Sequence, residues 1–167
     1  IMYDPDENVI RLLFQGAISK RDWINDFRFP AKLYKNQEHW FLVHRGFGDA
    51  WQSARDKIIT ELTEFILMIE SSGDFDTPAA KIQIPGHSMG GALALLAAED
   101  FRYQFNRPAD EVVTFGSPKP VFGILSKRHF KKSAKSWKQY RFMYDGVTWC
   151  PPFIGYHNVT SNVIDKK

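Results

Sequence analysis

The clearest periodic pattern of hydrophobic positions predicts an amphipathic helix that begins at Asp49. Apolar residues recur there at steps of three and four, which places them on one face of a helix. Asp49 suits the N-cap position, because its carboxylate can accept hydrogen bonds from the first free backbone N–H groups. The pattern stops at Ser71-Ser72-Gly73. The helix therefore turns one stripe towards a core, made of Trp51, Ala54, Ile58, Leu62, Phe65, Ile66 and Ile69.

Shorter apolar runs predict strands on both sides of this helix. The runs at residues 33–35 and 40–44 flank a polar turn and predict a hairpin. Later runs alternate with helical segments, an order typical of parallel strands joined by crossover helices. The predicted fold class is therefore α/β, with a mostly parallel central sheet, helices on both faces and a single domain over residues 1–167. The other predicted strands are residues 9–14, 81–84, 111–115, 139–144 and 159–164.

One stretch combines a strand, a tight turn and a helix, and reads KIQIPGHSMGGALALLAAED from residue 81 to residue 100. Ser88 stands at the tip of the turn, with Gly86 two residues before it and Gly90 two residues after it. Glycines at these places leave room for the strand and the helix to approach each other. The N-terminus of the helix directs unpaired N–H groups at whatever reacts on the serine. Ser88 is therefore the candidate nucleophile.

The composition fits one globular domain without a membrane span. The chain has 167 residues, of which 44% are hydrophobic, and no apolar run approaches the ~20 residues that cross a bilayer. We therefore expect a soluble protein, while the compartment stays open because no signal peptide is visible from Ile1 onward. The single cysteine, Cys150, excludes an internal disulfide and a multi-cysteine metal site. Neither a cofactor nor a metal is expected.

Positive charge is concentrated in residues 127–138, from Lys127 to Lys138. This segment holds six basic residues and no acid, whereas the net charge of the whole chain is only +3. A solvated helix face or loop is the favoured interpretation. The alternative is transient contact with an anionic lipid surface. Nucleic-acid binding is not expected, because no nucleic-acid module accompanies the charge.

A serine hydroxyl is a weak nucleophile and needs a base within hydrogen-bond reach. The chain offers five histidines. His87 adjoins the serine, but neighbours at a tight turn point in different directions, so it is interpreted as structural. His39 and His44 precede the serine and are interpreted as packed or exposed residues, which leaves His129 and His157.

The acid is chosen by chain order and by sheet edge. Where a serine sits on such a strand-to-helix turn, an acid and then a histidine follow it, at the carboxyl ends of strands. Asp145 and His157 satisfy this order, and the predicted triad is Ser88, Asp145 and His157. A turn residue is the alternative role for Asp145, which precedes a glycine. The carboxylates open to His129 lie instead at the start of a strand or on a helix: Asp110, Glu111, Glu99 and Asp100.

Two backbone N–H groups are the predicted donors to the oxyanion that forms during acyl transfer. One belongs to Met89, directly after the nucleophile. The other belongs to Ala17, in the loop after the strand at residues 9–14. The next segment runs from Ile18 to Pro30 (residues 18–30) and is rich in aromatic residues. Ordinary packing is its favoured interpretation, and a mobile lid is the alternative.

Taken together, these motifs resemble the class 3 lipases, the α/β-hydrolase family of fungal triacylglycerol lipases. The resemblance implies a serine ester hydrolase that acts on lipid carboxylic esters without a cofactor, with residues 18–30 as the lid segment. It covers nearly the whole chain, with the motifs in the family's order. They are LLFQGAISKRDWINDF from residue 12, VHRGFGDAWQSARDKI from residue 43, GHSMGGALALLAA around Ser88, VTFGSPKP from residue 113 and MYDGV around Asp145.

The chain departs from the family pattern in two places. Ala17 stands where the family has a serine or threonine, so the hydroxyl that helps to hold the oxyanion hole is missing, which implies weakened rather than abolished catalysis. The spacing from Asp145 to His157 is short, which implies a compact member. The leading hypothesis is a lipase. The alternatives are a short-chain carboxylesterase or phospholipase A1, and a binding module that kept the fold and lost the chemistry.

Overall fold

The structure is a computed structural model, and it describes residues 1–16, 30–36, 39–73, 78–142, 144–152, 154–159 and 163–166. Ala17 and most of the predicted lid segment lie outside these ranges. Within them, no helix combines the length and the apolar character that crossing a membrane requires.

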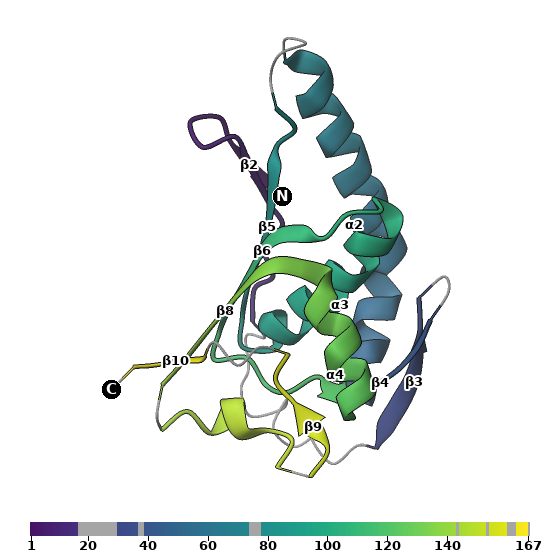
Figure 1. Cartoon of the computed structure of the whole chain (residues 1–167), viewed down its shortest axis with the longest axis vertical. Helices are drawn as coiled ribbons and strands as arrows, with labels where there is room; N and C mark the ends of the chain where they lie inside the picture. The colour runs from purple at the N-terminus through teal and green to yellow at the C-terminus, as the bar shows by residue number, and fades with distance from the viewer. Residues whose placement is uncertain are drawn as a thin grey trace.

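The main sheet of the described residues is mostly parallel, as the sequence predicts (Figure 1). Only the first strand pairs with its neighbour in the antiparallel direction, and every later pair is parallel. The carboxyl ends of these strands therefore meet at one edge, where catalytic groups are expected. In spatial order the strands are β1 (Met2–Asp4), β2 (Val9–Arg11), β5 (Lys81–His87), β6 (Ala109–Phe115), β8 (Ala134–Phe142) and β10 (Val163–Lys166).

A second, smaller sheet is entirely antiparallel and carries the predicted histidine. Its first two strands form the predicted hairpin. The next strand follows the carboxyl end of β6 and pairs with the last one, with Val121 opposite His157. His157 is thereby brought to the end of the molecule where β6 finishes. In order, the strands are β3 (Ala31–Lys35), β4 (Trp40–His44), β7 (Val121–Phe122) and β9 (Tyr156–His157).

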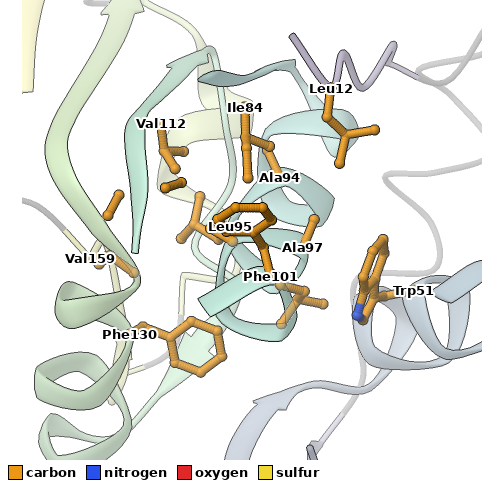
Figure 2. Close-up of a cluster of buried hydrophobic side chains, with 14 of the residues drawn as sticks. Leu12, Trp51, Ile84, Ala94, Leu95, Ala97, Phe101, Val112, Phe130 and Val159 are labelled. Carbon is orange, nitrogen blue, oxygen red and sulfur yellow. The ribbon is translucent and has the colours of Figure 1, made fainter. Parts of the chain in front are cut away.

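The core forms around α3 (Met89–Gln104), which lies between the main sheet and α2 (Arg45–Ser72). Figure 2 shows Leu95 of this helix between Val112 of the sheet and Trp51 of α2. Because α3 packs on both sides, it is apolar around most of its circumference. Its interior position agrees with the sequence prediction. Its fully buried apolar residues are Ala92, Ala94, Leu96, Ala97, Ala98 and Phe101.

The helix α2 begins at Arg45 rather than at the predicted Asp49. Phe47 and Trp51 are both buried and lie four residues apart, so the apolar stripe extends one turn further upstream than Trp51. Asp49 is not the N-cap. It lies inside the helix, where it forms ion pairs with Lys32 and Arg45.

The described helices α2, α3 and α4 (Ile124–Phe130) lie on one side of the main sheet in Figure 1. The sequence predicted helices on both faces, and within the described ranges they cover one. The opposite face carries a row of polar side chains that bond across the strands. Arg11 donates to Gln83 at 3.0 Å, and Gln83 donates to Glu111 at 3.3 Å. These bonds satisfy polar groups that no described helix covers.

The basic run spans three elements, because β8 starts at Ala134 and not at the predicted residue 139. Its other parts lie in α4 and in η1 (Lys131–Ser133). On β8, Lys135 pairs with Asp110 at 2.7 Å and Lys138 with Glu111 at 2.6 Å. These two charges act within the sheet and add little to an anion-attracting surface.

Candidate active site

Ser88 occupies the sharp turn between β5 and α3 in a backbone conformation that side chains rarely adopt. Its φ is 54° and its ψ is −127°. A residue other than glycine in this region is strained, and such strain marks functional turns when the surroundings hold it in place. Two backbone hydrogen bonds help to keep Ser88 in this conformation, from Ser88 N to Phe115 O at 2.8 Å and from Gly91 N to Ser88 O at 2.9 Å.

The flanking glycines are required by contact as well as by sequence pattern. A Cβ on Gly86 would lie 2.4 Å from the carbonyl oxygen of Gly90, and a Cβ on Gly90 would lie 2.3 Å from the carbonyl oxygen of Phe14. Real Cβ atoms do not approach carbonyl oxygens so closely. The predicted close approach of strand and helix is therefore confirmed at Gly86, whereas Gly90 makes room for the loop after β2.

The loop that follows β2 lies directly against the turn that carries Ser88. Phe14 accepts a hydrogen bond from His87 N at 3.1 Å and donates its own N–H to Pro85 O at 3.0 Å. A Cβ on Gly16 would lie 3.1 Å from Cβ of Ser88. Ala17, the predicted second oxyanion donor, is the next residue but lies outside the described ranges. Met89, the predicted first donor, is the first residue of α3.

Asp145 lies beside the carboxyl end of β6. The last residue of this strand, Phe115, also accepts the hydrogen bond from Ser88 N. One carboxylate oxygen, Oδ2, lies 2.8 Å from the position of a Cβ on Gly116, the residue that follows Phe115. The other, Oδ1, accepts a hydrogen bond from Val147 N at 3.1 Å and caps η2 (Gly146–Trp149). Asp145 thus has the turn role that the sequence offered as its alternative. It also stands at the edge that the triad prediction required.

His157 is half-buried on β9, at the end of the molecule where the parallel strands finish (Figure 1). Burial lowers the pKa of its imidazole, and the charges of Lys127 and Lys119 lower it further. Among the hydrogen bonds between described residues, none joins the His157 side chain to Ser88 or Asp145. The structure therefore brings the three predicted residues to one edge without linking them into a chain of hydrogen bonds.

The other histidines serve different contacts. His129 Nε2 lies 2.6 Å from Oε1 of Glu99, a helical carboxylate that the sequence had named among its possible partners. Burial lowers the pKa of His44 to about 4, and its ring packs against Phe47 and Tyr156. His87 is exposed, with Nδ1 only 3.0 Å from the position of a Cβ on Gly16.

Comparison with known proteins decides the family. The sequence model described as "Lipase (class 3)" matches residues 11–153. The chain belongs to the class 3 lipase family. This class 3 lipase chain has the α/β-hydrolase fold, as the resemblance of its motifs implied.

Individual relatives agree with this assignment. Over 129 residues the chain is 30% identical to "Secreted mono- and diacylglycerol lipase A" of Penicillium cyclopium, which covers 76% of this chain and 38% of that relative. Over 133 residues it is 30% identical to "Phospholipase A1-Igamma2, chloroplastic" of Arabidopsis thaliana, which covers 66% of this chain and 25% of that relative. The chain thus spans well under half the length of these curated relatives.

Solved structures give the same fold. A mono- and diacylglycerol lipase from Aspergillus oryzae superposes with a TM-score of 0.74 at 25% identity, over 95% of this chain and 54% of that one. A Rhizomucor miehei lipase in complex with its propeptide superposes with a TM-score of 0.77 at 22% identity, over 92% and 46% of the two chains.

The sequence prediction did not identify the structural role of two buried carboxylates in this class 3 lipase chain. Asp100 accepts hydrogen bonds from Tyr34 and from the indole N–H of Trp51, the latter at 2.6 Å. Burial raises the pKa of its carboxyl, although both donors oppose this. Glu99, which is fully buried, accepts from Asn36 at 3.1 Å. The visible signal was an acidic pair inside an otherwise apolar helix.

We expect Gly90→Ala to lower the free energy of unfolding by about 1–3 kcal/mol, the usual range for overpacking. The new methyl group would collide with the carbonyl oxygens of Phe14 and Gln15 and displace the loop beside Ser88. Urea unfolding of the purified variant measures this. Gly146→Ala is the matched control, because nothing described lies within 4 Å of its Cβ position. Equal stability of the two variants would contradict the packing described for Gly90.

Proposed function

We propose that this chain hydrolyses carboxylic esters of lipids through an acyl-enzyme intermediate on Ser88. The observation that carries the proposal is the strained Ser88 turn, with φ of 54° at the start of α3 and the loop after β2 packed against it. A turn of this kind places a serine oxygen next to free helical N–H groups. Membership of the class 3 lipase family supports the same chemistry.

In the proposed mechanism, Ser88 Oγ attacks the ester carbonyl while His157 takes its proton. The N–H groups of Met89 and Ala17 stabilise the negative charge on the carbonyl oxygen. His157 then returns the proton to the leaving alcohol. Water, deprotonated by the same imidazole, attacks the acyl group and restores Ser88.

Asp145 has the role of orienting His157 and stabilising its protonated form. The proposal therefore needs the imidazole to close on both Ser88 and Asp145 when substrate binds. Catalytic hydrogen bonds are often long without substrate and tighten in the complex. Support for this closure comes from the position of all three residues beyond the carboxyl ends of the parallel strands.

The proposed substrates are acylglycerols. The names of the fungal relatives, which describe mono- and diacylglycerol lipases, support this class. Phospholipids are the second candidate, because several plant relatives are named phospholipases A1. A soluble short-chain ester is the remaining alternative.

Rates on p-nitrophenyl esters of increasing acyl length, with and without an emulsion, test the substrate class. A lipase keeps its rate on long chains and gains rate at the emulsion surface. A steep fall beyond short soluble chains would favour a carboxylesterase. Hydrolysis of phosphatidylcholine at the first acyl position, and of acylglycerols only weakly, would favour a phospholipase A1.

Contact with the lipid interface is proposed through residues 18–30 and through the part of the basic run on α4 and η1. The first segment is aromatic in sequence, but only Pro30 of it is described. On α4 and η1, the residues Lys127, Arg128, Lys131 and Lys132 remain outside the ion pairs made by β8. Each basic residue near an anionic membrane contributes about 1 kcal/mol.

We expect Asp145→Asn to lower kcat by about 10⁴-fold, because an amide cannot hold the reactive tautomer of the histidine or stabilise its charge. Steady-state kinetics on a p-nitrophenyl ester measure the loss. Asp56→Asn, on the exposed face of α2, is the control and should keep wild-type kcat. Full kcat in Asp145→Asn would remove this residue from the mechanism.

We expect the acid limb of the kcat/KM profile to move to higher pH in Lys119→Gln. The base must be neutral, and the charge of Lys119 helps to keep the pKa of His157 below its ordinary value of 6.5. Removing that charge makes the imidazolium easier to form, so activity is lost at a higher pH than in the wild type. Lys57→Gln on α2 is the control. An acid limb at the same pH or at a lower pH in Lys119→Gln would contradict the effect of Lys119 on the pKa of His157.

A further inference from the structure

An open pocket of about 610 Å³ lies where the C-terminal end of α3 meets α4, η1 and the turn between β3 and β4. Its lining is strongly basic. Five of its side chains carry or can carry positive charge, and none of the described lining residues is acidic. The five are His39, Arg102, Arg107, His129 and Lys132.

The described acid that bonds to this lining, Glu99, is already paired. Glu99 is fully buried, and its oxygens accept hydrogen bonds from Arg102 at 2.9 Å, from Asn36 at 3.1 Å and from Ser133. Its charge is therefore balanced inside the protein and is shielded from the open pocket. Among the described residues that line the pocket, the charged and chargeable side chains are all basic.

Two of the permanent charges are available to a ligand. Among the described residues, neither Arg107 nor Lys132 takes part in an ion pair. The guanidinium of Arg107 lies 5.7 Å from the centre of the Phe101 ring, which holds it at the pocket wall. Asn106, which also lines the pocket, adds a neutral hydrogen-bond donor.

Burial is the main reason that the pKa of His129 is lowered, and neighbouring positive charges add to it. These charges are those of Arg102 and His39, whereas Glu99 acts on the pKa in the opposite direction. The rings of His39 and His129 are 4.9 Å apart. An anion that enters the pocket would relieve the repulsion between these groups.

The pocket is distant from the proposed active site. Ser88 precedes the first residue of α3, whereas Arg102 and Tyr103 belong to its last turn. At 1.5 Å per residue, the two ends of this helix are about 22 Å apart. A ligand in the pocket therefore does not touch the reacting atoms.

We propose that this pocket binds a phosphate-class anion, either a phospholipid headgroup or a free phosphate ester. Arginine forks and a lysine ammonium match the several oxygens of a phosphate. The carboxylate of a fatty-acid product offers fewer acceptor oxygens, and the pocket's polar lining suits no acyl chain. This site is independent of the chemistry proposed for Ser88.

Isothermal titration calorimetry of the purified chain with inorganic phosphate, at low salt, tests whether the pocket binds the anion. The wild type should bind phosphate saturably. The double variant Arg107→Gln/Lys132→Gln should lose at least about ten-fold in affinity, since each charge-assisted contact carries much of the binding energy. Lys131→Gln is the matched control, because it removes one charge beside Lys132 from a residue that does not line the pocket. Its affinity for phosphate should equal that of the wild type.

Vesicles of phosphatidylcholine, with and without phosphatidic acid, identify the source of the phosphate group. Loss of binding to the anionic vesicles in the double variant, with competition by inorganic phosphate, assigns the pocket to a lipid headgroup. Unchanged vesicle binding with lost phosphate binding assigns it to a free phosphate. Lys132→Gln alone repeats the test without disturbing the contact of Arg107 with Phe101.

Two results would overturn the proposal. One is the absence of saturable phosphate binding in the wild type. The other is an equal loss in Lys131→Gln, which would mean that diffuse surface charge, rather than the pocket, attracts the anion. Ester hydrolysis should stay at the wild-type rate in Arg107→Gln, and a thermal unfolding curve that matches the wild type confirms that the double variant is folded.

Discussion

Ser88→Ala is expected to lower kcat for ester hydrolysis by about 10⁶-fold, the loss seen when the nucleophile of a catalytic triad is removed. The alanine has no oxygen to form the acyl-enzyme, so only binding and the oxyanion donors would still assist water. The turn itself should survive. Its positive φ is held by backbone hydrogen bonds that the substitution does not touch.

Steady-state kinetics on a soluble p-nitrophenyl ester measure this loss. Ser71→Ala, at the exposed end of α2, is the control and should retain the wild-type rate. Circular dichroism of both variants shows whether the fold is intact. A folded Ser88→Ala variant with wild-type kcat would exclude Ser88 as the nucleophile.

His157→Ala is expected to cause a loss of about the same size, because the serine and the histidine of a triad act as one unit. Without the imidazole, no group takes the proton from Ser88 or gives it to the leaving alcohol. The double variant with Ser88→Ala should therefore be hardly slower than either single variant. Such non-additivity distinguishes a shared catalytic step from two separate structural defects.

His39→Asn provides the comparison for the histidine, since His39 is exposed at the opposite end of α3 from Ser88. It should keep wild-type kcat. Added imidazole restores part of the activity of many enzymes that have lost a catalytic base, and the space left in His157→Ala, which is only half-buried, can admit it. Wild-type kcat in His157→Ala would contradict the proposed base.

The turn at Ser88 could be predicted because its determinants are local. Gly86, Ser88 and Gly90 lie within five residues, and the strand before and the helix after them are visible in the apolar pattern. The contacts that require the glycines lie between neighbouring turns of chain, apart from the approach of Phe14. The family motifs surround the same residues and favour the same interpretation.

The starts of α2 and β8 could not be placed correctly, because the deciding contacts are distant in sequence. Glycine is a weak helix former and flanks Phe47 on both sides, but the burial of Phe47 in the core extends the helix. At β8, Lys135 and Lys138 each follow a buried residue, Ala134 and Trp137. The carboxylates of β6 that neutralise these lysines cannot be identified from the run itself.

The hydrogen-bond partners of the buried acids of α3 could not be predicted from the sequence either. Asp100 meets Trp51 and Tyr34, which lie 49 and 66 residues away in the chain. The sequence shows two acids in an apolar helix, but it does not show which donors will satisfy them. The basic pocket is likewise assembled from three separate segments.

Labelling with a serine-directed alkyl phosphonate, followed by mass spectrometry of the digested protein, tests the central claim most directly. The phosphonate forms a stable bond only with a serine that a neighbouring base activates and oxyanion donors assist. We predict one adduct per chain, on the peptide that contains Ser88, and none in Ser88→Ala. An unlabelled wild type would leave a binding module on a lipase fold, and an adduct that persists in Ser88→Ala would place the nucleophile elsewhere.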